Sequence, residues 1–183
     1  MDEGAAPRRN HWVNHIARHA HEKPGATYLR FGGASITWAQ LHERIALVAA
    51  ALRQRGVRAG DRVAIMMTNR PEFLETMFAV NALGAIVVPV NFRLAPQEIA
   101  FILTDSGASL LVVEEAVGAA AAAARAACRH EIGFVSTGVV AGADPYFADA
   151  SAGGPGEASG VRARRLAVRS RCRGPTCLRT ARP

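Results

Sequence analysis

The sequence lacks the features that mark membrane-spanning or secreted proteins. Among its 183 residues, no apolar stretch approaches the roughly 18 residues that a membrane helix requires. The first ten residues, MDEGAAPRRN, contain two acids and no apolar core, so no secretory signal is expected. Three cysteines cannot form an even disulfide framework. We therefore expect a cytoplasmic protein without a transmembrane segment, whose thiols are free at Cys128, Cys172 and Cys177.

Phosphate-binding fingerprints are also missing. The sequence contains no GxGxxG, no GxxxxGK[ST] and no Gly/Ser/Thr-rich loop that leads into a helix. Residues Asn69–Glu72 could place backbone N–H groups at a helix N-terminus, where anions bind. An ordinary helix cap is the simpler interpretation of the same residues.

Candidate metal ligands occur without a complete ligand set. His11, His15 and His19 are spaced to share one helical face, but no second group of ligands is visible for them. Cys172 and Cys177 lack the two further ligands of a zinc site, and Cys128 has no neighbour that would activate a thiolate. The sequence therefore predicts no metal site.

Positive charge is concentrated at the end of the chain. The formal net charge is +7, yet residues 160–183 hold eight of the 22 basic residues and none of the 15 acids. The preceding 159 residues carry 14 basic and 15 acidic side chains and are nearly neutral. This arginine-rich tail has no aromatic residue for base stacking and no recognisable binding module, so we expect no specific nucleic-acid partner.

The first third of the chain has clear helix and turn signals. Residues 11–22 have helical spacing, and Gly32-Gly33 separates two β-prone runs in a manner typical of a hairpin. Thr37 followed by Gln40 forms a capping-box pattern, which predicts a helix that stops at Gly56.

The middle of the chain alternates apolar runs with helical patterns. Continuous apolar runs are typical of strands covered on both faces, and two successive βαβ units imply a parallel sheet with right-handed crossovers. Ligands are then expected near the carboxyl ends of the strands. The predicted strands are Val63–Met67, Ala85–Val90 and Ser109–Val113, and the helices between them are Pro71–Leu83, ended by Gly84, and a second from Pro96 to Gly107.

The region after Glu115 gives weaker signals. The run AVGAAAAAARAAC can be helical on alanine propensity, but it has almost nothing to anchor it in a core. EIGFVS could form one more strand. Residues 138–160 are rich in Gly, Ala, Ser, Asp and Pro, and no structure is assigned to them.

Four blocks of the sequence carry a family resemblance. The blocks GDRVAI, NRPEF, GAIVVPVNFRL and EIAFIL occur in family order and spacing, and from about His11 to Glu115 the chain resembles the N-terminal part of AMP-forming acyl-CoA synthetases. In particular it looks like a bacterial long-chain fatty-acid–CoA ligase. The resemblance implies an α/β fold, the N-terminal part of the adenylate-forming ligase large domain, with a β-hairpin plus parallel βαβ units and flanking helices.

The resemblance also implies a two-step reaction in full-length members. A carboxylate attacks the α-phosphate of ATP to give an acyl-adenylate and pyrophosphate, and coenzyme A then takes the acyl group. This chemistry needs phosphate donors, Mg²⁺ and a lysine near the reacting oxygens. In the family these parts lie downstream of the segment seen here, and Lys23 does not match either lysine role. We therefore assign no catalytic, cofactor-binding or metal residue to this chain, and we expect ATP, Mg²⁺ and coenzyme A only in full-length members.

These observations predict a domain organisation and two alternative functions. Residues 1–10 are expected to be a flexible N-terminus, 11–150 a partial AMP-dependent synthetase/ligase domain, and 151–183 a low-complexity, Arg-rich tail that is disordered or frame-shifted. The leading hypothesis is a truncated acid–CoA ligase, inactive alone. The alternative is a non-catalytic α/β binding or regulatory module, which associates with a protein partner or with itself through a surface exposed by truncation.

Overall fold

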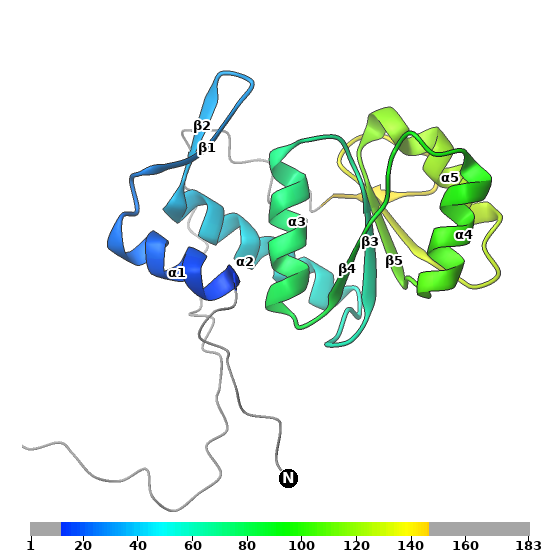
Figure 1. Cartoon of the computed structure of the whole chain (residues 1–183), viewed down its shortest axis with the longest axis horizontal. Helices are drawn as coiled ribbons and strands as arrows, with labels where there is room; N and C mark the ends of the chain where they lie inside the picture. The colour runs from blue at the N-terminus through cyan, green and yellow to red at the C-terminus, as the bar shows by residue number, and fades with distance from the viewer. Residues whose placement is uncertain (1–11, 147–183) are drawn as a thin grey trace, which may run out of the picture.

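The computed structural model describes residues 12–146, which contain six helical and seven strand segments (Figure 1). Within this range no helix is long and apolar enough to cross a lipid bilayer. Residues 1–11 and 147–183 lie outside the described part, and so do the predictions made for them. In chain order the elements are α1 (Trp12–Glu22), β1 (Thr27–Phe31), β2 (Ala34–Thr37), α2 (Trp38–Gln54), β3 (Arg62–Met66), α3 (Pro71–Ala82), β4 (Ile86–Pro89), α4 (Pro96–Ser106), β5 (Leu110–Val113), the short 3₁₀ helix η2 (Glu115–Val117), α5 (Gly118–Ala126), β6 (Gly133–Ser136) and β7 (Asp144–Pro145).

Local sequence signals explain the N-terminal elements. Gly32 and Gly33 have φ angles of 57° and 81°, which allow the tight turn between antiparallel β1 and β2. The Thr37 hydroxyl accepts a hydrogen bond from the Gln40 N–H, and the Gln40 side chain accepts one from the Thr37 N–H. This capping box starts α2, as the sequence predicts.

The remaining strands form one parallel sheet in the order β4-β3-β5-β6-β7. Strands β3 and β5 occupy inner positions, and the sheet residues of β5 are all buried. The predicted α/β fold, a hairpin plus parallel βαβ units, is confirmed.

Helices cover the two faces of the sheet (Figure 1). One core lies on the side of α2 and α3 and includes Leu52, Ile65 and Val112. The other lies on the side of α4 and α5 and includes Leu103 and Leu111. Since successive residues of β3 and β5 point to opposite faces, each strand contributes to both cores.

Two predictions from the sequence are wrong. Among residues 12–146, strand β4 is an edge strand that pairs only with β3, and its Ile86 side chain is 51% exposed, although the apolar run predicted burial on both faces. The alanine-rich helix α5 was expected to lack anchorage in a core, yet Ala121 and Ala124 are fully buried where α5 packs beside α4. Small side chains allow this close approach between helices.

The segment before residue 146 is more ordered than its composition indicates. Although no structure was assigned to residues 138–160, Asp144 and Pro145 form β7 beside β6. The side chain of Tyr146 follows directly and is buried in the core that contains α2 and α3. Residues 147–160 of that interval lie outside the described part of the chain.

Candidate functional site at the carboxyl edge of the sheet

The carboxyl ends of all five parallel strands lie at one edge of the sheet, where ligands of open α/β sheets bind. The turn between β3 and α3, residues 67–70, projects from this edge. Glu114 follows β5 at the same edge, and Tyr146 follows β7. These residues come from distant parts of the sequence and form a polar cluster.

The carboxylate of Glu114 lies at the centre of the cluster, with a side chain that is only 3% exposed. It accepts hydrogen bonds from the Thr68 backbone N–H at 2.9 Å and from the Thr68 hydroxyl at 3.1 Å. A third bond comes from Nη1 of Arg70 at 3.3 Å. Glu114 therefore bonds Thr68 and Arg70 of the β3–α3 turn, across 46 and 44 residues of sequence.

Arg70 connects Glu114 to the first turn of α3. Its Nε and Nη2 atoms donate to the two carboxylate oxygens of Glu72 at 3.2 and 3.1 Å, a bidentate arrangement. Burial opposes ionisation of Glu72, but the hydrogen bonds from Arg70, a backbone hydrogen bond and the charges of Arg70 and Arg44 together outweigh it and lower the Glu72 pKa. The hydrogen bond with Glu72 likewise raises the pKa of Arg70. The acid also complements the positive end of the α3 dipole.

This geometry decides what residues 69–72 can bind. The sequence allows them to act as anion-binding donors at a helix N-terminus or, more simply, as a helix cap. In the structure, carboxylates of the chain itself already occupy the turn, and a phosphate there would face the charges of both Glu72 and Glu114. The described residues of this turn therefore do not fit a nucleotide phosphate, and their arrangement is that of a rigid scaffold.

A second group of polar side chains lies between α2, α3 and the end of β7. The hydroxyls of Thr76 and Tyr146 are 2.9 Å apart, and both residues are buried. Nearby, Nε of Arg44 donates to the Glu75 carboxylate at 2.5 Å. Burial raises the Glu75 pKa despite this contact, because the carboxylate is almost completely removed from solvent.

From the sequence, no site role is assigned to Glu114 or Tyr146. One signal could have found Glu114, because an acid directly follows the apolar run of β5 at the end of a parallel strand. Its partner Thr68 is too distant in the sequence for any local pattern to reveal. For Tyr146 the surrounding sequence is rich in Gly and Ala and offers no comparable signal.

The other residues weighed from the sequence have structural contacts. Lys23 lies in the loop after α1 with Nζ 5.7 Å from the centre of the Trp38 ring. The His19 ring packs on the same tryptophan at 4.6 Å, and burial lowers its pKa. His15 is near Arg18, whereas His11, Cys172 and Cys177 lie outside the described residues. Among residues 12–146, no group of three or more His, Cys, Asp or Glu side chains could hold a metal ion.

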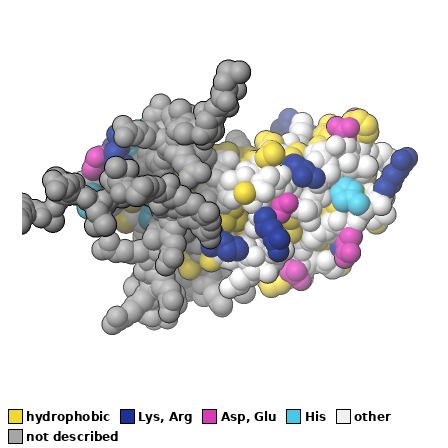
Figure 2. Space-filling view, turned by 90° about the horizontal axis from the view of Figure 1, so that it is seen from below, with side chains coloured by type: hydrophobic (Ala, Val, Ile, Leu, Met, Phe, Trp, Pro, Cys, Tyr) yellow, Lys and Arg dark blue, Asp and Glu magenta, His cyan; other side chains and the backbone are white. Residues whose placement is uncertain are grey.

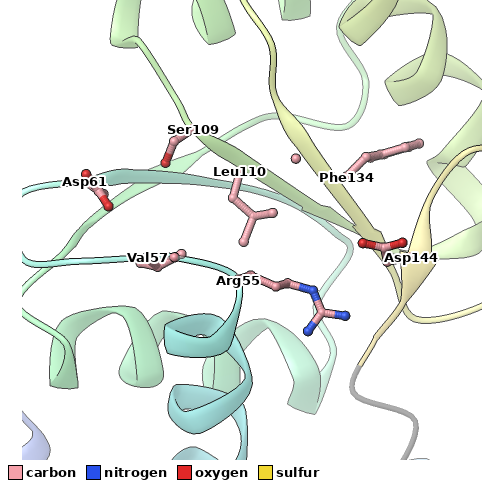
Figure 3. Close-up of a pocket in the computed structure, with 9 residues that line it drawn as sticks. Arg55, Val57, Asp61, Ser109, Leu110, Phe134 and Asp144 are labelled. Atoms are coloured by element: carbon pink, nitrogen blue, oxygen red, sulfur yellow. The ribbon is translucent and has the colours of Figure 1, made fainter.

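A hollow of about 280 Å³ lies near the opposite edge of the sheet (Figure 3). Leu110 and Gly133, at the amino ends of β5 and β6, contribute to its wall, together with Arg55 after α2. The Arg55 side chain extends toward Asp144 and donates to the Pro145 carbonyl at 3.3 Å. Its wall is formed mainly at the amino ends of the strands rather than at the carboxyl ends where parallel sheets bind ligands, and the hollow is smaller than a typical ligand pocket.

Surface charge gives no sign of a nucleic-acid site on the face seen in Figure 2. Where described residues are visible there, basic and acidic side chains are interspersed rather than gathered by sign. A nucleic-acid-binding surface is expected to carry a continuous basic stripe.

Comparisons with known proteins agree with the fold. The AMP-binding enzyme family matches residues 16–166. A feruloyl-CoA synthase of Amycolatopsis is 50% identical over 95 residues, which are 52% of this chain and 19% of that protein. A fatty acid–[acyl-carrier-protein] ligase of Streptomyces coeruleorubidus is 34% identical over 118 residues, 64% of this chain and 23% of that protein. The chain thus spans about a fifth of the length of these relatives.

A solved structure gives the same relationship in three dimensions. A Rhodopseudomonas palustris protein described as a long-chain-fatty-acid CoA ligase superposes with a TM-score of 0.69 and 31% identity, over 73% of this chain and 34% of that one. The hairpin, the parallel sheet and its helices therefore correspond to the N-terminal part of an adenylate-forming ligase. On the family match, which covers most of the sequence, the chain belongs to the AMP-binding enzyme family of acid–CoA ligases.

Proposed function

We propose that residues 12–146 form a scaffold of the large domain of an AMP-forming acid–CoA ligase, and that this 183-residue chain does not form acyl-adenylate or acyl-CoA by itself. The observation that carries the proposal is the internally satisfied carboxyl edge. At the β3–α3 turn Glu114 accepts from the Thr68 N–H and Glu72 accepts from the Arg70 guanidinium, so a phosphate there would face two carboxylates. The catalytic groups must then come from other sequence.

The lysine content of the sequence also supports a chain that is inactive by itself. Lys23 is the single lysine of the sequence, and its ammonium group lies over the Trp38 ring in the N-terminal elements. Neither a phosphate-loop lysine nor a mobile catalytic lysine is therefore supplied by this chain. In the full reaction, a fatty or other carboxylic acid, ATP and coenzyme A would give acyl-CoA, AMP and pyrophosphate. The relatives are named for aromatic and fatty acids, and the scaffold does not select between them.

Complementation tests the proposal. The purified chain is incubated with ATP, Mg²⁺, coenzyme A and either ferulate or a long-chain fatty acid, and pyrophosphate release is measured. We expect none above a no-enzyme blank. Co-expression with the downstream remainder of the Amycolatopsis feruloyl-CoA synthase, supplied as a separate chain, should give release that the remainder alone does not. Pyrophosphate release by the chain alone, or no gain on co-expression, would refute the proposal.

A non-catalytic module that binds a protein partner or itself is the second candidate. Exposed apolar side chains favour it: Phe101 on α4 is 69% exposed and Ile86 on β4 is 51% exposed. Light scattering of the purified chain between low and high micromolar concentration tests self-association. A mass that stays monomeric at every concentration would contradict the self-association form of this candidate.

A further inference from the structure

Strand β7 is joined to the sheet by few backbone hydrogen bonds. It consists of two residues, and only Val135–Asp144 and Ser136–Pro145 are paired in its register with β6. Beyond the strand, the Tyr146 N–H donates to the Ser136 carbonyl at 2.6 Å, and Arg55 donates to the Pro145 carbonyl. A two-residue edge strand with so few bonds belongs to the least stable part of a sheet.

The side chain of Tyr146 contrasts with this weak pairing. The residue is 7% exposed and belongs to the same core as Val112 and Val135 of neighbouring strands. Its hydroxyl is 2.9 Å from that of Thr76 and 3.4 Å from the Glu72 carbonyl. The Thr76 hydroxyl also donates to the Glu72 carbonyl at 2.7 Å, so the two hydroxyls and this carbonyl form one hydrogen-bonded group.

These bonds connect β7 to the polar cluster at the carboxyl edge. Glu72 accepts at its backbone carbonyl from Thr76 and binds Arg70 through its carboxylate. Arg70 also donates to the Glu114 carboxylate, which accepts a further hydrogen bond from the Thr68 hydroxyl. A continuous path of hydrogen bonds therefore leads from the last described residue to the β3–α3 turn.

We propose that Tyr146 is a positioning residue: its hydroxyl, bonded to Thr76, anchors β7 and fixes the place at the carboxyl edge from which the following segment leaves the sheet. The family match continues through residue 166, beyond the last described residue. In the ligase proposed above, on which this inference rests, the anchor sets where the downstream sequence starts relative to the β3–α3 turn.

Hydrogen exchange of the intact chain tests the anchor without any need for catalysis. Tyr146→Phe removes only the hydroxyl, and Thr76→Val removes its partner at nearly constant volume. A buried hydrogen bond of ordinary strength predicts that peptides covering residues 137–146 exchange about 2- to 10-fold faster in either variant. Peptides covering β4 and α4 should keep their wild-type rates.

Two controls separate the anchor from general destabilisation. Tyr28→Phe makes the same chemical change on β1 and should leave residues 137–146 unaffected. The double variant Tyr146→Phe/Thr76→Val should exchange more slowly than the product of the two single effects predicts, because both changes remove the shared Tyr146–Thr76 bond. Unchanged exchange at 137–146, an equal acceleration throughout the sheet, or fully additive effects would each overturn the proposal. Failure of complementation with these exchange results intact would refute only the proposed function.

Discussion

Replacing Glu114 by glutamine is the most direct perturbation of the carboxyl edge. The amide oxygen can still accept from the Thr68 N–H, but the charge-assisted bond from Arg70 is lost and an NH₂ group faces the guanidinium. Hydrogen bonds to charged groups contribute about 1.5–3 kcal/mol each. Arg70 retains its ion pair with Glu72 and is partly exposed to solvent, so its charge is not left unpaired. We therefore expect a loss of about 2 kcal/mol in the free energy of unfolding. In a folded unit of this size, that lowers the thermal midpoint by roughly 6–10 °C.

The assay is thermal and urea unfolding followed by circular dichroism, with Glu115→Gln as the matched control. Glu115 is the next residue in the chain and is exposed, so its substitution should change the unfolding free energy by less than about 0.5 kcal/mol. Glu114→Ala should cost about 3 kcal/mol, since it also leaves the Thr68 N–H without its partner. If Glu114→Gln and Glu115→Gln unfold at the same midpoint, the view of Glu114 as the organiser of the turn is refuted.

Three further variants test other parts of the scaffold. Arg62→Ala should lose about 1–3 kcal/mol of unfolding free energy, because Arg62 donates to the Ser106 and Gly107 carbonyls at the end of α4. Urea unfolding measures this loss, and comparison with Arg62→Lys gives the part that depends on the guanidinium group. Equal stability of Arg62→Ala and wild type would contradict this prediction. Leu52→Ala should cost about 2–5 kcal/mol in the same assay, since Leu52 is fully buried, and a loss below 1 kcal/mol would argue against the packing described. Burial raises the Glu75 pKa above its usual 4.5, so the protonated form favours folding and this stabilisation is lost as pH rises through the raised pKa. In urea titrations, the unfolding free energy of Glu75→Gln should therefore equal that of wild type in acid and exceed it at neutral pH. A wild type that is more stable than Glu75→Gln at neutral pH would show that the ion pair with Arg44 outweighs the cost of burial.

The elements predicted correctly are those whose signals are local. The capping box of Thr37 and Gln40 and the Gly32-Gly33 turn each act within a few residues, so sequence alone identifies them. The edge position of β4 depends on which strands pair beside it, and its apolar run resembles that of the inner strand β5. Sheet order is a property of the whole chain, which explains why burial of Ile86 was predicted wrongly.

Packing and the polar cluster were less predictable for related reasons. Ala121 and Ala124 have side chains too small to indicate a buried face by periodicity, yet small size is what permits contact between α4 and α5. Glu114 and Thr68 bond across 46 residues, and Tyr146 and Thr76 across 70. Family resemblance located the fold but could not reveal these pairings, which depend on side-chain geometry.

The free edge of β4 affects how the chain would behave at high concentration. The N–H groups of Ile86 and Val90 donate to the carbonyls of Asp61, just before β3, and Ile65. The N–H positions of residues 87 and 89 therefore face outward, and Pro89 has no N–H. Another β-strand could accept a hydrogen bond only from the Val87 N–H at this edge, instead of from a row of N–H groups. Growth of cross-β fibrils from this edge is therefore unfavourable. Association of the folded protein at high concentration should consequently arise from side-chain contacts. It should reverse on dilution and leave thioflavin fluorescence unchanged.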